Sequence, residues 1–239
     1  MTNITKNTFT SDIEGASFEQ KIFEKLGTFF GKPADELYSQ FQISTNNKSK
    51  NSQLISAILG ISGNANSSKE FIEHHTILKT IRIEENNSIR EHMSFPTFSF
   101  IELSKENWEN SSLRQFFLNS RFLFVVFKKI KGIYYLEKIK FWKMPLLILD
   151  GPVKDTWSYT KDLIINGDIV KTYDGKKYTT NFPGSTYNEI CHVRPHDSLS
   201  IEKGKGAELP FPDKLTGITR YTKHCFWLDS KYISNIIND

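Results

Sequence analysis

The order of apolar and polar residues has a helical period in the first quarter of the chain, after a polar arm or linker expected at residues 1–16. Apolar residues recur every three or four positions, which is typical of amphipathic helices. Ser17 followed by Gln20 matches a capping box and predicts the start of the first helix, and Gly31 predicts its end. Similar stripes predict helices at about 33–43 and 51–60. Residues 17–65 are therefore expected to form a helical part.

After residue 65 the pattern changes to an alternation of apolar and polar residues, which is typical of strands. The sequence KIKG between two such runs predicts a hairpin. The expected strands are 76–83, 97–103, 121–128, 133–143, 189–194 and 219–228. The expected helices are 106–118, a helix that Asp150 caps, and a short one at 230–237. This order predicts an α/β fold in which a central mixed β-sheet, within a core at 66–239, is flanked by helices.

The composition is that of an ordinary globular protein. Of 239 residues, 38% are hydrophobic, which is enough for a core, and 13% are aromatic, which predicts a core rich in rings. The sequence contains no run of about 18 apolar residues and no apolar segment at its start, so neither a membrane span nor a secretory signal is expected. The two cysteines lie far apart and predict buried thiols in a cytoplasmic protein. The six histidines are scattered without ligand spacing, so no metal site is expected.

Positive charge is concentrated in one part of the chain. The net charge is +4, but residues 121–145 hold one Arg, six Lys and one Glu, a local +6 that leaves −2 for the remainder. One interpretation is a solvated hairpin whose lysines keep strand edges from pairing with other chains. The other is a face that contacts nucleic-acid phosphates. The candidate phosphate ligands are Lys128, Lys129, Lys131, Lys138 and Lys140, with Lys203 and Lys205 in the long loop 197–218.

The strand expected at 76–83 carries a lysine on a face that is otherwise apolar. Residues two apart on a strand share a face, so Lys79 lies with Ile77, Ile81 and Ile83. An acid two positions before a strand lysine is typical of magnesium-dependent nucleases, because the carboxylate binds the ion while the lysine stabilises developing charge. Here that position is Ile77. A lysine that reaches solvent at a sheet edge is the alternative interpretation.

Three motifs along the chain carry a family resemblance. The sequences TILKTI at 76–81, WENSSLR at 108–114 and ICHVRPH at 190–196 resemble the family of the mismatch-repair nicking endonuclease MutH and the GATC-cutting Sau-type type II restriction endonucleases. The likeness extends over about 20–237 and is greatest to the non-catalytic C-terminal half of the Sau-type enzyme. It implies a restriction-endonuclease-like PD-(D/E)xK fold, a MutH-like two-lobed clamp around duplex DNA, and recognition of GATC.

The resemblance also implies where catalytic residues would lie, and most of them are replaced. The family's helical acid corresponds to Ser56 and its lysine to Lys79, while its two strand acids correspond to Glu70 and Ile77. A hydroxyl and an isoleucine cannot hold Mg²⁺ against its hydration shell. No catalytic residue and no cofactor for binding are therefore expected, and Mg²⁺ would matter only if other acids rebuilt the site. The acids nearby in sequence are Glu73, Glu84 and Glu85.

Base recognition is implied for Arg194, Pro195 and His196, which correspond to the family's Arg-Pro-x element. An arginine can donate two hydrogen bonds to O6 and N7 of guanine in the major groove. A structural ion pair is the alternative role for Arg194. His196 stands where MutH has a lysine, so the likeness is incomplete at the third position.

These observations leave three hypotheses. The leading one is a catalytically degenerate domain that binds duplex DNA containing GATC, as the regulatory half of a restriction endonuclease, together with a catalytic MutH-like domain or subunit. The second is an active magnesium-dependent GATC endonuclease with a rearranged metal site. The third is a protein-interaction scaffold that retains the fold without binding DNA.

Overall fold

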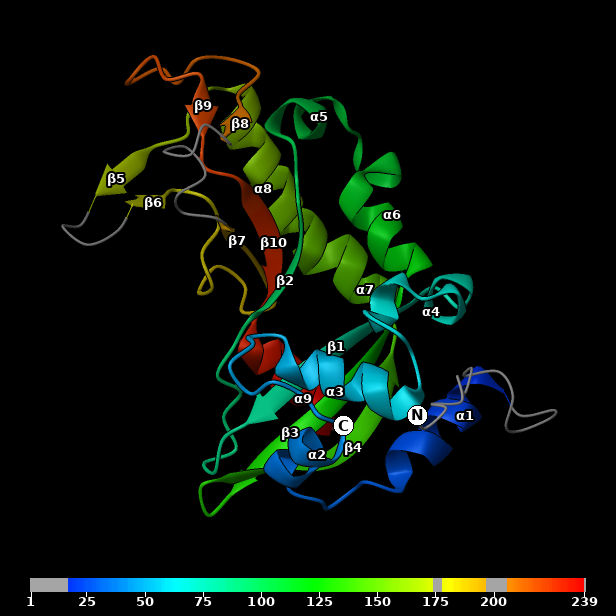
Figure 1. Cartoon of the computed structure of the whole chain (residues 1–239). Coiled ribbons are helices and arrows are strands. Elements are labelled where there is room, and N and C mark those ends of the chain that lie inside the picture. Colours follow the sequence, from blue (N-terminus) through cyan, green and yellow to red (C-terminus); the bar gives the residue numbers. More distant parts are fainter. Residues whose placement is uncertain (1–16, 174–177, 197–205, 239) are drawn as a thin grey trace. The chain divides into compact units, whose positions relative to one another are not determined.

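The computed structural model describes most of the chain (Figure 1). The described residues are 17–173, 178–196 and 206–238. The arm expected at 1–16 and the candidates Lys203 and Lys205 lie outside them. Within these ranges, no helix has the length and apolar character needed to cross a membrane. Cys191 and Cys225 are buried and not disulfide-bonded, as their spacing predicted.

The described residues form two compact units, each assembled from separate segments of the chain. The first unit contains the residues up to Glu91 together with Asn119–Lys143. The second contains His92–Leu118 and the residues from Met144 onward. No continuous stretch of sequence therefore makes up either unit.

The first unit begins with helices, as the apolar stripes predicted. They are α1 (Phe18–Gly27), α2 (Ala34–Gln40) and α3 (Lys50–Leu59), followed by the 3-10 turn η1 (Ala65–Ser67) and the short α4 (Lys69–Glu73). The capping box is confirmed, because the hydroxyl of Ser17 accepts the N–H of Gln20 and the side chain of Gln20 accepts the N–H of Ser17. The first helix ends at Gly27 and not at the predicted Gly31. Gly31 instead adopts a φ of 78° and donates its N–H to the carbonyl of Leu136, which joins the chain to the sheet.

The sheet of the first unit has three strands in the order β1-β3-β4. They are β1 (Thr76–Ile83), β3 (Arg121–Ile130) and β4 (Ile133–Trp142). The sheet is mixed, because β1 runs parallel to β3 and β3 runs antiparallel to β4. The β3–β4 hairpin turns at Lys131 and Gly132, whose φ values of 48° and 83° suit a two-residue turn of type I′. The hairpin predicted around KIKG is therefore confirmed.

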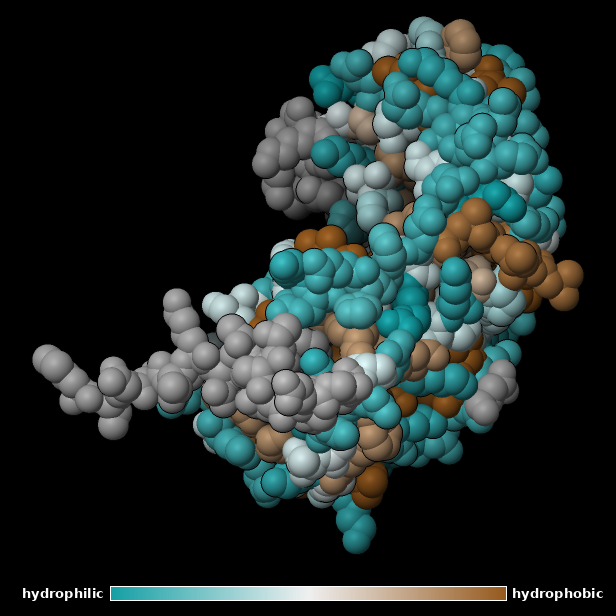
Figure 2. All heavy atoms as spheres, turned by 90° about the vertical axis from the view of Figure 1, so that its right-hand side faces the viewer, coloured by the Kyte–Doolittle hydropathy of each residue, from teal (hydrophilic) through white to brown (hydrophobic). Residues whose placement is uncertain are grey.

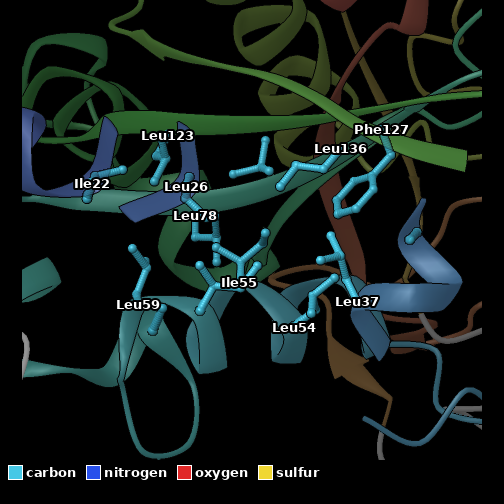
Figure 3. Close-up of a cluster of buried hydrophobic side chains, with 14 of the residues drawn as sticks. Ile22, Leu26, Leu37, Leu54, Ile55, Leu59, Leu78, Leu123, Phe127 and Leu136 are labelled. Atoms are coloured by element: carbon cyan, nitrogen blue, oxygen red, sulfur yellow. The ribbon is translucent and has the colours of Figure 1, made fainter. Parts of the chain in front are cut away.

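One face of this sheet carries the core of the first unit (Figure 3). Buried side chains from the sheet meet buried side chains from the three helices. The sheet contributes Leu78, Leu123, Val125, Phe127 and Leu136, and the helices contribute Ile22, Leu26, Leu37, Leu54, Ile55 and Leu59. Burying each such side chain stabilises the fold by about 1.5–3 kcal/mol. This burial fixes the register of β1 against β3, because a slip of one residue would turn Leu78 away from the helices.

The second unit contains an antiparallel sheet of three strands in the order β2-β10-β7. Its strands are β2 (Met93–Thr97), β7 (Cys191–Pro195) and β10 (His224–Leu228). Two short ribbons pair β5 (Lys171–Tyr173) with β6 (Tyr178–Thr180) and β8 (Ala207–Glu208) with β9 (Arg220–Tyr221). The helical segments are α5 (Phe100–Lys105), η2 (Trp108–Asn110), α6 (Ser112–Asn119), α7 (Leu146–Ile148), η3 (Leu149–Val153), α8 (Lys154–Ile165) and α9 (Ser230–Asn238). The mixed α/β class is confirmed, with the described strands divided among these sheets.

Two strand predictions for the second unit are wrong. The strand expected at 97–103 is the end of β2 followed by α5, because the hydroxyl of Ser99 accepts the N–H of Glu102 and caps a helix there. Phe100 and Leu103, three residues apart, are the buried residues of that helix. The strand expected at 219–228 is interrupted, and its two parts, β9 and β10, pair with different partners.

Asp150 does not cap a helix, which corrects another prediction. It lies in η3, a π-helical segment without a side-chain cap. Its carboxylate accepts hydrogen bonds from Trp108 Nε1 at 2.7 Å and from Arg114 Nε at 2.8 Å. The acid therefore stabilises a contact between distant segments of the second unit.

Hydrophilic residues dominate the face of the molecule that Figure 2 shows, and hydrophobic residues gather there in separate groups. Among the described residues, the large apolar side chains with the greatest exposure include Leu147 at 84% and Leu146 at 60%. Both belong to α7. Exposed apolar side chains are common on protein surfaces, and these two carry no functional argument alone.

Candidate functional site

The four positions implied as a degenerate active site lie in the first unit, but they are not a set of metal ligands. Ser56 is buried in α3, and its Oγ accepts the N–H of Ala65 at 3.1 Å. Glu70 lies in the first turn of α4 and not on the strand, which corrects its expected place. Ile77 on β1 offers no ligand atom. Mg²⁺ prefers several oxygen ligands in octahedral geometry, so a single carboxylate among these four residues does not fit it.

Lys79 shares a face of the sheet with two other lysines. The strand register places Lys79 of β1 beside Phe124 of β3, and Phe124 beside Lys140 of β4. Residues paired across neighbouring strands point to the same face. Lys138 lies two residues before Lys140 and therefore points the same way. Three half-buried ammonium groups thus lie on the face opposite to the helix-covered core.

The acids near the strand have structural partners. Glu73 lies 3.6 Å from Lys69 within α4. Glu84 accepts the hydroxyl of Tyr134 at 2.6 Å, and this hydrogen bond, followed by that of Lys129, holds the pKa of Glu84 below its ordinary value. The contacts of Glu84 connect the end of β1 to the β3–β4 hairpin, and the described residues form no cluster of carboxylates beside Lys79.

The lysines of the hairpin differ in their surroundings. Lys128 donates to the carbonyl of Glu84 at 3.1 Å and to the side chain of Asn87. Lys129 lies 3.3 Å from the carboxylate of Glu84. Lys131 is exposed in the turn. A phosphate could therefore approach Lys131 directly, whereas it would compete with partners within the protein for Lys128 and Lys129.

The predicted base-reading residues lie in the second unit, at the end of β7. Arg194 is half-buried, and its Nη2 lies 3.1 Å from Nε2 of His92. The guanidinium of Arg194 points its hydrogens at Nε2 of His92, and the N–H of Ser230 points at Nδ1 at 3.2 Å, whereas a neutral imidazole accepts at only one of its two nitrogens. Pro195 is half-buried opposite His224, and His196 is exposed. Among the described residues, the hydrogen-bond partner of Arg194 is therefore a histidine, and no carboxylate forms an ion pair with it there.

Two histidines and an aspartate meet next to Arg194. Nδ1 of His92 lies 3.3 Å from Oδ2 of Asp229, and Nδ1 of His192 lies 3.9 Å from the same oxygen. Burial, with a smaller effect of Arg194 and His92, lowers the pKa of His192 to about 3. Burial and Arg194 also lower the pKa of His92. Both imidazoles are therefore neutral at pH 7, the form in which a ring nitrogen can accept a hydrogen bond or bind a metal.

Sequence reasoning missed this group. The histidines are scattered along the sequence, but the fold brings His92 and His192 into one cluster with Asp229. One sequence feature pointed to it: His192 precedes Arg194 by two residues, so both lie on one face of a strand. The approach of His92 depends on β2 and β7 both flanking β10, a pairing of distant segments that local patterns do not encode.

Comparison with known proteins finds one relative that supports the motif resemblance. No model of a protein family matches the chain. The chain is 32% identical, over 266 aligned residues, to the type II restriction enzyme Sau3AI of Staphylococcus aureus. The match covers 99% of this chain and 54% of that enzyme, so the chain spans about half the length of this relative. The similarity supports a relationship between the chain and restriction endonucleases.

Proposed function

We propose that this chain binds duplex DNA containing GATC without cutting it, as the regulatory half of a type II restriction endonuclease. On this proposal it has a restriction-endonuclease-like PD-(D/E)xK fold and acts with a catalytic MutH-like domain or subunit. The similarity to a type II restriction enzyme supports DNA as the partner. The proposed loss of cleavage rests on two positions that correspond to metal ligands. The hydroxyl of Ser56 accepts a hydrogen bond from the backbone of Ala65, and Ile77 has no ligand atom.

In this proposal the two units contribute different contacts. Arg194 would donate to O6 and N7 of guanine, a contact that distinguishes base pairs in the major groove. Lys131, Lys138 and Lys140 would contact phosphates, which strengthens binding without reading the sequence. His92, 3.1 Å from the guanidinium of Arg194, would position that side chain before DNA arrives. The lysines would therefore determine the affinity and Arg194 the sequence specificity, so that separate substitutions can test the two properties.

The decisive test is binding of short duplexes that contain either GATC or a scrambled site, in buffer with chelator and no divalent ion. We expect tighter binding to GATC, with an affinity that falls with salt by roughly 0.9 log units per log unit for each phosphate contact. Arg194→Ala should reduce the GATC preference by about 1–3 kcal/mol. Lys131→Ala, the matched control, should weaken binding to both duplexes equally. Equal binding of the unaltered chain to both duplexes would contradict the proposal.

The absence of cleavage is tested separately with supercoiled plasmid that contains GATC. We expect the plasmid to stay intact with Mg²⁺ or Mn²⁺, because only Glu70 among the four corresponding positions carries a carboxylate. Cleavage that disappears in both Glu70→Ala and Lys79→Ala would instead establish the alternative of an endonuclease with a rearranged metal site. Failure to bind any duplex at low salt would favour the protein-interaction scaffold.

A further inference from the structure

The second unit contains three side chains whose ligand atoms converge: His92 just before β2, His192 in β7 and Asp229 just after β10. One ligand atom from each lies within 4.8 Å of the other two. Asp229 Oδ2 is nearest to both imidazoles, at 3.3 Å from His92 Nδ1 and 3.9 Å from His192 Nδ1. The group is distinct from Ser56 and Ile77, which lie in the first unit.

The imidazole of His192 is enclosed and lacks hydrogen-bond partners. Its side chain is 0% exposed, and neither ring nitrogen has a partner among the described residues. The ring meets the edge of His92 at a centroid distance of 4.7 Å and stacks on Trp227 at 6.5 Å. Buried polar atoms in native proteins almost always have a partner. Two such nitrogens, one of them facing a carboxylate at 3.9 Å, are therefore available to a ligand.

Asp229 is oriented toward the histidines by its own contacts. Its Oδ1 accepts the N–H of Lys231 at 2.9 Å, at the start of α9. That bond fixes the carboxylate and leaves Oδ2 directed at the two imidazoles. The side chain is 6% exposed, so water competes little for this oxygen. Such support of a ligand by a neighbouring backbone group is typical of metal sites.

We propose that His92, His192 and Asp229 bind a divalent transition-metal ion, Zn²⁺ in the first place, with water as a fourth ligand. Two imidazoles and a carboxylate are borderline ligands that suit zinc better than magnesium or calcium. In a tetrahedral zinc site with bonds of about 2.0–2.1 Å, neighbouring ligand atoms lie about 3.4 Å apart. The observed separations of 3.3 and 3.9 Å are close to this value, and the widest, 4.8 Å or less, requires only a small side-chain rotation.

Binding of the ion has a consequence for Arg194. Nδ1 of His92 accepts the N–H of Ser230 at 3.2 Å, a hydrogen bond that an ion on Nδ1 would replace, and Nε2 lies 3.1 Å from the guanidinium of Arg194. When a metal occupies Nδ1, the hydrogen of the neutral ring is on Nε2. Two donors would then face each other, so Arg194 must turn away from His92. The metal site and the orientation of Arg194 are therefore coupled.

The test is metal binding by the full chain after treatment with a chelator, with Zn²⁺ in competition with a chromophoric chelator and Co²⁺ as a spectroscopic probe. We expect one equivalent of Zn²⁺, a rise of the melting temperature with Zn²⁺, and visible cobalt bands of a four-coordinate site. His192→Ala, His92→Gln and Asp229→Asn should each weaken binding by roughly 100-fold. If the histidine variants misfold, Asp229→Asn still tests the site. Asparagine also caps a helix well, so this variant should keep the start of α9 folded.

The control is His196→Ala. His196 is exposed and its Nδ1 lies 3.6 Å from Sγ of Cys225, so an adventitious ion could bind there. Co²⁺ bound at His196 and Cys225 would show a near-ultraviolet charge-transfer band from the thiolate. Co²⁺ bound by two histidines and an aspartate would not show this band. Failure of the unaltered chain to bind, unchanged binding in Asp229→Asn, or a thiolate band lost in His196→Ala would overturn the proposal. The assay contains no DNA, so a failure to bind the ion is distinguished from a failure of the proposed DNA binding.

Discussion

At the scale of single residues, Asp213 illustrates how a buried charge is kept. Its side chain is buried, but Oδ1 accepts the N–H groups of Leu215 and Thr216, each at 2.8 Å, and Oδ2 accepts the hydroxyl of Tyr221 at 2.5 Å. Burial alone would raise the pKa of Asp213, but the hydrogen bonds from Tyr221, Thr216 and Leu215 outweigh it and hold the pKa below its ordinary value. The ionised carboxylate therefore stabilises the folded second unit.

Asp213→Ala should lower the free energy of unfolding by about 3 kcal/mol at pH 7, since three donors lose their acceptor. A folded-state pKa below the unfolded value of about 3.9 means that this stabilisation is present above that pH and is lost as the pH falls through the folded-state pKa. Urea unfolding at pH 7 and at low pH should therefore show the difference between the two proteins narrowing in acid. Asp168→Ala, which breaks an exposed ion pair with Lys214, should cost less than about 1 kcal/mol. Similar losses in the two variants would contradict this account.

At the scale of elements, the sequence predicted most accurately where local chemistry and tertiary contacts agree. The capping box at Ser17 and the hairpin turn at Lys131 and Gly132 are local structures, and both are confirmed. The segment 97–103 alternates like a strand, but Ser99 caps a helix with Phe100 and Leu103 on its buried side. Short alternating segments fit either period, so the tertiary environment decides.

For the candidate site, too, the sequence predicted residue identities but not tertiary contacts. The absence of a carboxylate at Ile77 can be read from the sequence, because it concerns residue identity. The partners of the sequence-implied residues could not be read, because they come from strands far apart in the chain. Arg194 contacts His92, and Lys129 contacts Glu84. Such contacts depend on the register and pairing of strands, which periodicity alone does not determine.

Glu84→Gln tests whether the β3–β4 hairpin meets DNA, on the proposed function. The amide oxygen can still accept the hydroxyl of Tyr134, but the charge that pairs with Lys129 is removed. We expect only a small loss of stability, because the ion pair is partly open to solvent. Lys129 would become available to a phosphate, so the salt dependence of DNA binding should steepen by roughly 0.9 in log–log slope for any sequence. The control is Glu73→Gln, which disturbs an ion pair within α4. An unchanged slope in Glu84→Gln would show that Lys129 does not contact DNA phosphates.

At the scale of the whole molecule, the proposed function assigns the phosphate contacts and the base contacts to different units. The first unit holds the candidate phosphate ligands of the sheet and hairpin, and the second holds Arg194 and its histidine neighbours. The first unit is also assembled from two segments, because β1 pairs with β3 from the segment that follows Leu118. A fragment must therefore include both segments to retain the core that Leu78 shares with Leu123.

Two fragments test this organisation together with the proposed function. Residues 1–91 lack β3 and β4, so the apolar face of β1 and the helices would be exposed, and we expect no cooperative unfolding by circular dichroism. Residues 1–143 contain all segments of the first unit and should retain a cooperative transition. This longer fragment should bind duplexes with a strong salt dependence but with equal affinity for GATC and scrambled sites, because Arg194 is absent. A retained GATC preference would mean that bases are read from the first unit, and the role given to Arg194 would then be wrong.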